Sequence, residues 1–210
     1  MKKLLIEHVS TIQISKSSLV ESMQKNDGHL IVRNVLLQRA DVPNANRRIY
    51  PKRILERELN KYFSKITDRR AFGECDHANE NVVNLKNVCQ AIVDARWVGN
   101  EIYGDVQILN TPAGNIIREI LLAGFRVGQS SRGLGSVEPL NENEDDLVEV
   151  QDDFEFVTLA DAVSDESTYG ANMTLHESRI VTSTVNLKYE KINKLITEIR
   201  CDLSGICCIK

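Results

Sequence analysis

A short reversal between two runs of β-branched residues constrains the fold more than any other feature of this sequence. The runs cover residues 88–98 and 101–109, and Gly99 and Asn100 stand between them. β-branched side chains favour strands, and a Gly-Asn pair suits the tight turn between two antiparallel strands. The sequence therefore predicts a β-hairpin in this region.

Apolar runs elsewhere predict further strands. They cover residues 30–38, 147–151 and 154–163, and another strand is expected near the N-terminus. Only 5% of the residues are aromatic, whereas 42% are hydrophobic, so the core must consist mainly of Ile, Leu and Val. This pattern predicts a mainly antiparallel α+β fold with about six or seven strands.

Two helices are predicted between these strands. Pro51 suits the first turn of a helix over residues 51–64, and Thr111 can cap a second helix that starts at Pro112 and ends at Gly124. The expected apolar face of the second helix consists of Ile116, Ile117, Ile120 and Leu121. A further amphipathic stretch covers residues 187–200.

Charge and cysteine content argue against several classes of function. The formal charge of −4 argues against nucleic-acid binding through bulk electrostatics, because such binding needs a clustered excess of Lys and Arg. No run is long enough to cross a membrane, and the first ten residues lack the features of a signal peptide. The five cysteines show no zinc-site spacing. We therefore expect a soluble intracellular protein that uses no nucleic acid, membrane, metal or cofactor.

Residues 128–136 form a run dense in glycine and serine. Such a run is typical of a polar loop, because glycine favours turns. Glycine also lets the backbone approach a substrate closely, so that amide groups can stabilise an oxyanion and Ser130 can act as a nucleophile. The residues alone leave both interpretations open.

Two titratable residues are candidate partners for this serine. His77 lies between a predicted helix and a predicted strand, and a histidine can accept and return a proton at neutral pH. Asp161 lies in the apolar run 157–163, where a carboxylate needs a partner such as His77. Glu74, Asp76 and His77 could instead bind a metal, but adjacent side chains of an extended chain point to opposite faces.

Three blocks of sequence occur in a characteristic order. The first is NRRIYPKRIL at residues 46–55, the second consists of Gly73, Glu74 and His77, and the third is GQSSRGLGS at residues 128–136. The first and third blocks are long and specific, and the second has the right position between them. Together they resemble the T-even branch of the phage prohead (procapsid maturation) protease family, over about residues 30–170.

The resemblance implies a fold and a domain organisation. The fold would be assemblin-like, as in herpesvirus proteases, with a mainly antiparallel β-barrel surrounded by helices. The protease domain would cover residues 1–180, and residues 181–210 would form a C-terminal helical tail that self-cleavage can remove.

The resemblance also implies a catalytic site. The family's histidine falls on His77 and its serine on Ser130, although the adjacent Ser131 fits the motif as well. Related phage proteases carry an acid in a strand after the serine, and Asp161 is similar to it.

Two further parts of this site follow from the same resemblance. Asp165 and Glu166 are substitutes for the acid in the later strand. Backbone amides around Arg132 and Gly133 would hold the oxyanion.

The implied function is that of a serine endopeptidase inside the phage prohead, in the host cytoplasm. Its substrates would be scaffold or core proteins and major capsid proteins, cut after Glu in a Leu-or-Ile, any residue, Glu context. The same context occurs at residues 19–21 and 196–198, so the chain would be a zymogen that cleaves itself. A homo-oligomer or larger assembly within the prohead is expected.

The alternative function is structural. A catalytically silent capsid-core or tube-like protein could share the barrel and use the basic run at residues 47–53 as a contact surface.

Overall fold

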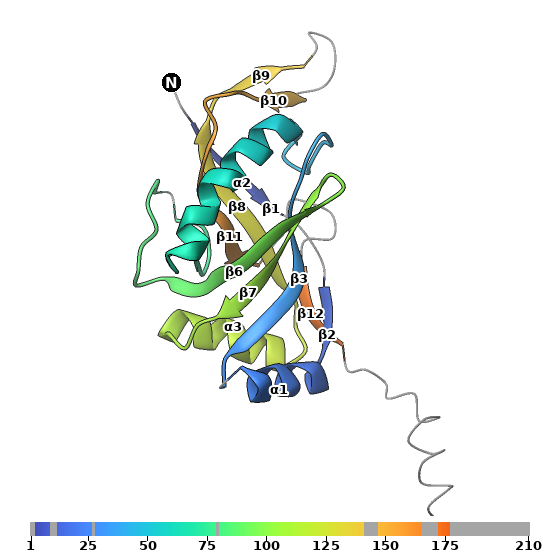
Figure 1. Cartoon of the computed structure of the whole chain (residues 1–210), viewed down its shortest axis with the longest axis vertical. Coiled ribbons are helices and arrows are strands. Elements are labelled where there is room, and N and C mark those ends of the chain that lie inside the picture. The colour runs from blue at the N-terminus through green and yellow to red at the C-terminus, as the bar shows by residue number, and fades with distance from the viewer. Residues whose placement is uncertain are drawn as a thin grey trace, which may run out of the picture. The chain divides into compact units, whose positions relative to one another are not determined.

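The computed structural model describes residues 3–8, 12–26, 28–78, 80–140, 147–164 and 172–176. Within these residues the chain forms helices and strands in the arrangement of Figure 1. The helices are α1 (Lys16–Lys25), α2 (Lys52–Thr67) and α3 (Pro112–Leu122). The strands are β1 (Lys3–His8), β2 (Ile12–Ser15), β3 (Leu30–Arg39), β4 (Arg48–Ile49), β5 (Phe72–Glu74), β6 (Val88–Val98), β7 (Glu101–Ile108), β8 (Val127–Gly135), β9 (Val137–Pro139), β10 (Val148–Val150), β11 (Glu155–Val163) and β12 (Asn172–His176).

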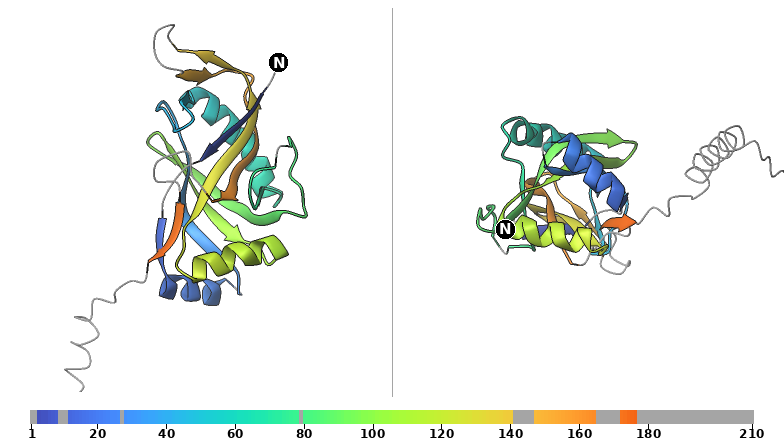
Figure 2. Two further views of the ribbon diagram at one scale, coloured as in Figure 1. Left: turned by 180° about the vertical axis from the view of Figure 1, so that it is seen from behind. Right: turned by 90° about the horizontal axis from the view of Figure 1, so that it is seen from below.

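The strands form three sheets. In the five-stranded sheet, β8 pairs with β11 along one edge and with β1 and β12 along the other, and β2 pairs with β12. The left view in Figure 2 shows β1 (dark blue) beside β8 (yellow). The four-stranded sheet has the order β3-β7-β6-β5, and the three-stranded sheet has the order β4-β10-β9.

Pairing is antiparallel except between β4 and β10 and between β2 and β12. The mainly antiparallel α+β class is therefore confirmed. In the part of the chain that is described, the strands do not close into a single barrel, and there are more of them than the sequence pattern indicated. The additional strands, such as β4, β5 and β9, have only two or three residues each, which is too short for a periodic pattern.

β6 and β7 form the predicted hairpin. Their register pairs Val98 with Glu101, so that Gly99 and Asn100 make the turn. Gly99 has a φ of +62°, a left-handed conformation that glycine adopts without steric cost.

The two predicted helices are also present. Pro51 precedes α2, and the hydroxyl of Thr111 accepts a hydrogen bond from the backbone N–H of Gly114 at the start of α3. The expected apolar face of α3 is wrong at Ile116, which is 55% exposed, whereas Ile117 is buried. The buried face of α3 is therefore narrower than the predicted one, and it includes Ile117 and Leu121.

The run at residues 128–136 is not a loop. Residues 127–135 form β8, and nearly all of them are buried between neighbouring strands. A Cβ atom at Gly133 would lie 2.3 Å from the Phe154 ring, so this glycine permits close packing rather than a turn. The sequence pattern failed here because glycine and serine are typical of turns, whereas the tertiary packing requires small residues in a strand.

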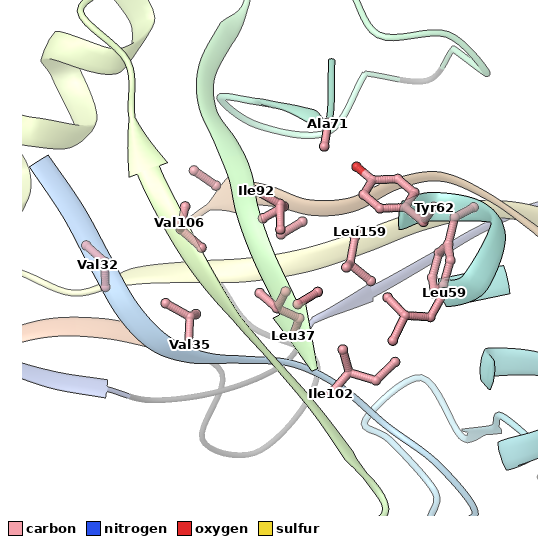
Figure 3. Packing of buried hydrophobic residues seen from close by; sticks show 14 of the residues in the cluster. Val32, Val35, Leu37, Leu59, Tyr62, Ala71, Ile92, Ile102, Val106 and Leu159 are labelled. Atoms are coloured by element: carbon pink, nitrogen blue, oxygen red, sulfur yellow. The ribbon is translucent and has the colours of Figure 1, made fainter. Parts of the chain in front are cut away.

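The hydrophobic core lies between the two larger sheets and α2. Figure 3 shows Val35 and Leu37 of β3, Ile92 of β6 and Leu159 of β11 in this core, together with Leu59 of α2. As the composition predicted, aliphatic side chains dominate. The few aromatic residues add edge-to-face contacts, such as that of Phe154 with Tyr50, whose ring centroids lie 5.3 Å apart.

Some predictions lie beyond the described residues. The amphipathic stretch at 187–200 and the tail at 181–210 are among them, so the domain boundary stays a prediction. The helix α1 was not predicted, and it contains the first self-cleavage context, with Glu21 exposed. None of the helices in the described ranges combines the length and apolar character that a membrane span needs.

Replacing Gly73 with alanine is expected to destabilise the domain. A Cβ atom on Gly73 would lie 2.0 Å from the carbonyl oxygen of Ala160, so β5 and β11 would have to separate. Overpacking of this kind costs about 1–3 kcal/mol of unfolding free energy, which urea denaturation would measure.

Alanine at Gly28 is the matched control for Gly73→Ala. Its Cβ atom would meet no other atom within 4 Å, so only the positive φ of +85° adds strain. A Gly73→Ala variant as stable as the wild-type chain would contradict the close approach of β5 and β11.

Candidate active site

The site lies where β5 of the four-stranded sheet meets β11 of the five-stranded sheet. An isolated parallel bridge joins Cys75 to Ala162, and the backbone N–H of Asp76 donates a 2.8 Å hydrogen bond to the carbonyl of Ala162. Asp76 has a φ of +62°, a left-handed conformation that Asp adopts more readily than most residues. The chain therefore leaves β5 in a fixed direction, and His77 follows immediately.

Three side chains meet at this junction. Ser130 of β8 and Asp161 of β11 are partners in the antiparallel register, next to a β-bulge between Thr158 and Asp161. Nε2 of His77 lies 2.5 Å from Oγ of Ser130, and Nδ1 of His77 lies 3.0 Å from Oδ2 of Asp161. The imidazole thus stands between the hydroxyl and the carboxylate, with one ring nitrogen facing each.

The carboxylate of Asp161 is fixed from two sides. Its Oδ1 accepts a 2.8 Å hydrogen bond from the backbone N–H of Glu74, while Oδ2 faces His77. Asp161 is fully buried. A backbone donor and the imidazole together compensate part of the cost of burying this charge.

Ser131 occupies a different environment from Ser130. Successive side chains of a strand point to opposite faces. On the face of β8 opposite to Ser130, the hydroxyl of Ser131 accepts a 3.0 Å hydrogen bond from the side-chain amide of Gln38. On the same face, Gln129 and Gln90 exchange amide hydrogen bonds. Strand geometry therefore separates the two serines, and Ser130 is the one that faces the imidazole.

Arg132 contributes its side chain to the site. The guanidinium is fully buried and forms an ion pair with Glu74. Its Nη1 donates hydrogen bonds to the carbonyl oxygens of Ala78 (3.1 Å) and Glu80 (3.0 Å). Nε lies 3.0 Å from Oδ2 of Asp161 but makes no hydrogen bond within the described part of the chain. Arg132 thus connects β8 to β5, to β11 and to the segment after His77.

The backbone amides of Arg132 and Gly133 lie within β8, which has a paired strand along each edge. Their proposed role toward an oxyanion stays a prediction. Ser130 is only 1% exposed, so a substrate carbonyl reaches its hydroxyl only after some neighbouring segment moves.

Sequence reasoning did not find the ion pair between Glu74 and Arg132. The signal was present, since each charged residue lies next to apolar or small residues in a strand, where an ionised side chain needs a partner. The sequence also offers Glu74 as a possible metal ligand. Its carboxylate instead binds Arg132 and accepts a 2.7 Å hydrogen bond from the backbone N–H of Asn84. Among the described residues, no group of three or more His, Cys, Asp or Glu side chains is arranged to hold a metal ion.

Two cysteines lie near this site and stay protonated at neutral pH. Burial raises the pKa of Cys75, and Asp76 adds to the effect. Burial also raises the pKa of Cys89, whose thiol donates to the carbonyl of Gly73 at 3.7 Å. Neither thiol is poised as a nucleophile, since the reactive form is the thiolate. The hydroxyl of Ser130, by contrast, lies beside an imidazole nitrogen that can accept its proton.

A hydroxyl, an imidazole and a carboxylate in a row are the chemical groups of a serine hydrolase, and here the hydroxyl and the carboxylate are buried. The model of the prohead core protein serine protease family matches residues 7–183, and the chain belongs to this family.

Two individual proteins of bacteriophage T4 are similar to the chain. It is 34% identical to the prohead core protein protease of enterobacteria phage T4 over 116 residues, which is 54% of this chain and 54% of that protein. The match thus spans about half of the length of this curated relative. The structure resembles that of the bacteriophage T4 capsid assembly protease with a TM-score of 0.63 and 27% identity, covering 77% of this chain and 97% of the other.

Proposed function

We propose that this chain is a serine endopeptidase that cleaves scaffold and major capsid proteins inside the phage prohead during maturation. The observation that carries the proposal is the imidazole of His77 between the hydroxyl of Ser130 and the carboxylate of Asp161, at 2.5 Å and 3.0 Å. The names of the two phage T4 relatives, a prohead core protein protease and a capsid assembly protease, support the substrate class.

In this mechanism Ser130 attacks the carbonyl carbon of the scissile peptide bond while Nε2 of His77 accepts the hydroxyl proton. Asp161 holds the tautomer with hydrogen on Nδ1 and stabilises the imidazolium. The imidazolium then gives its proton to the leaving amine, and an acyl-enzyme remains. Water, deprotonated by His77, hydrolyses this ester and regenerates Ser130. Amides of Arg132 and Gly133 would stabilise the oxyanion after a rearrangement that admits substrate.

A fluorophosphonate probe tests this function directly. Because it phosphonylates only activated serines, we expect one labelled peptide that contains Ser130. Labelling should disappear in His77→Ala. Absence of labelling both in the free chain and in assembled proheads would favour the structural alternative, a catalytically silent capsid-core or tube-like protein.

We further propose that cleavage follows Glu in a Leu-or-Ile, any residue, Glu context. A peptide with this context should be cleaved at least about tenfold faster than its Glu→Gln analogue, because a hydrogen bond to a charged group contributes about 1.5–3 kcal/mol. The same specificity applies to the chain's own Leu19, Val20 and Glu21. Equal rates for the two peptides, and intact ends by mass spectrometry of matured particles, would contradict this specificity.

Glu21 lies on the surface of α1, where it pairs with Lys25. A protease needs an extended substrate, so this self-cleavage requires α1 to unfold locally.

Two further parts of the proposal concern architecture and assembly. We infer that the five-stranded and four-stranded sheets are two sides of an assemblin-like barrel, joined by the bridge from Cys75 to Ala162. An experimental structure in which these sheets separate at that bridge would contradict this. We also infer that several copies act together inside the prohead in the host cytoplasm. Quantitative mass spectrometry of proheads purified from infected cells would count them, and a single copy would exclude the assembly.

A further inference from the structure

The site contains more buried charge than a serine, a histidine and an aspartate require. Glu74, Arg132 and Asp161 are all essentially inaccessible to solvent. Arg132 contacts both carboxylates, since it pairs with Glu74 and its Nε lies 3.0 Å from Oδ2 of Asp161. Burying three ions costs more free energy than an apolar cluster of the same volume would. Their arrangement therefore calls for a functional reason.

Counting the charges supplies this reason. Two carboxylates and one guanidinium give the cluster a net charge of −1, and the imidazolium of His77 would bring it to zero. Without the charge of Glu74, Arg132 would neutralise Asp161, and an imidazolium would be an uncompensated buried cation. Because opposite charges within about 4–6 Å favour an ionised group and like charges disfavour it, Glu74 controls how well the cluster accepts this proton.

We propose that Glu74 is a positioning residue that neutralises Arg132, so that the charge of Asp161 stays available to the imidazolium of His77. The inference rests on the proposed function. Glu74 acts through its neighbours and does not touch the reacting atoms. Arg132, with its hydrogen bonds to the carbonyls of Ala78 and Glu80, fixes the segment that carries His77. Because Glu74 neutralises its charge, the guanidinium can hold the segment after His77 in place without neutralising Asp161.

The other titratable groups around the cluster leave this balance unchanged. Burial raises the pKa of Cys75 beside β11, of Cys89 on β6 and of Tyr62 on α2, so all three are neutral in a neutral assay. Asp76 is exposed to solvent, which screens its charge. Glu80, exposed as well, contacts Arg132 through its backbone carbonyl.

The pH profile of kcat/KM tests the inference, because its acid limb reports protonation of the essential base in the free enzyme. Glu74→Gln keeps the side-chain shape but removes one negative charge. Its acid limb should move to lower pH by on the order of one unit, and its plateau kcat should fall about tenfold or more, because the imidazolium is less stabilised.

The double variant Glu74→Gln with Arg132→Met provides the decisive comparison. It restores the net charge of −1 but removes the hydrogen bonds from Arg132 to the carbonyls of Ala78 and Glu80. Its acid limb should therefore return to within about 0.3 units of the wild-type position, although its kcat stays low. If Glu74 had a purely structural role, the acid limb would be displaced further in the double variant than in Glu74→Gln, since the double variant is the more disrupted protein. The inference would be overturned if the acid limb of kcat/KM does not move in Glu74→Gln. It would also be overturned if the acid limb stays at lower pH in the double variant.

Controls separate this inference from the proposed function. The Glu101→Gln variant removes a carboxylate that pairs with Arg39 at 2.6 Å on the hairpin, and it should leave the profile unchanged. Thermal melting establishes whether each variant is folded. If the double variant does not fold, the test is whether the acid limb of kcat/KM lies at lower pH in Glu74→Gln than in Glu101→Gln. Activity that survives Ser130→Ala would refute the proposed function itself, whereas an unmoved limb in an enzyme dependent on Ser130 refutes only the role of Glu74.

Discussion

Replacing Ser130 with alanine is expected to lower kcat for peptide hydrolysis by about 10⁴-fold or more while the chain stays folded. The hydroxyl lies 2.5 Å from Nε2 of His77, the ring nitrogen that accepts its proton in the proposed mechanism. Removing it eliminates the acyl-enzyme route and leaves only the contribution of binding and oxyanion stabilisation. Steady-state kinetics with a Glu-containing peptide would measure the loss.

Ser131→Ala is the matched control for this prediction. It removes the neighbouring hydroxyl, which accepts a hydrogen bond from Gln38 on the other face of β8. The variant should lose about 1 kcal/mol of stability but keep its labelling by a serine probe. If Ser130→Ala were active and Ser131→Ala inactive, Ser131 would be the nucleophile, and the assignment of Ser130 from its contact with His77 would be wrong.

Replacing Asp161 with asparagine is expected to lower kcat by about 10⁴-fold with little change in KM. Oδ2 of Asp161 faces Nδ1 of His77 at 3.0 Å, and Oδ1 accepts the backbone N–H of Glu74 at 2.8 Å. Asparagine has one oxygen and one NH₂ group. If its oxygen keeps the bond from Glu74, the NH₂ group faces the imidazole and favours the tautomer with hydrogen on Nε2, which cannot accept the serine proton.

Asp152→Asn is the control for Asp161→Asn. Asp152 is an exposed acid that pairs with Arg53 and lies outside the site, so this variant should retain wild-type kinetics. A fully active Asp161→Asn would leave the substitutes named from the sequence, Asp165 and Glu166, as the remaining candidates.

Several parts of the fold follow from local rules. The hairpin of β6 and β7 follows from two strand-forming runs around Gly99, and α3 starts where Thr111 and Pro112 indicate. His77 and Ser130 could be named because they fall in sequence blocks that resemble one protease family, and Asp161 because it is an acid in an apolar run after the serine. Patterns of this kind depend on neighbours in the chain, which is why a sequence reveals them.

Other parts depend on contacts between segments far apart in the chain. The glycine and serine content of residues 128–136 is typical of a polar loop, whereas residues 127–135 form the buried strand β8. A buried strand of this composition is stable only because Gln38, Gln90 and Glu74 reach it from other strands and satisfy its polar groups. None of these partners can be paired with β8 from spacing alone.

The sequence by itself determined the central hairpin, the starts of α2 and α3 and the identity of the candidate catalytic residues, because propensity and capping act over a few residues and the family resemblance rests on short blocks. Only the tertiary structure decided that Ser130 rather than Ser131 contacts the imidazole, since strand pleating sends the two side chains to opposite faces. It also decided that the guanidinium of Arg132 pairs with Glu74 and lies beside Asp161, because these contacts depend on where β5 and β11 converge.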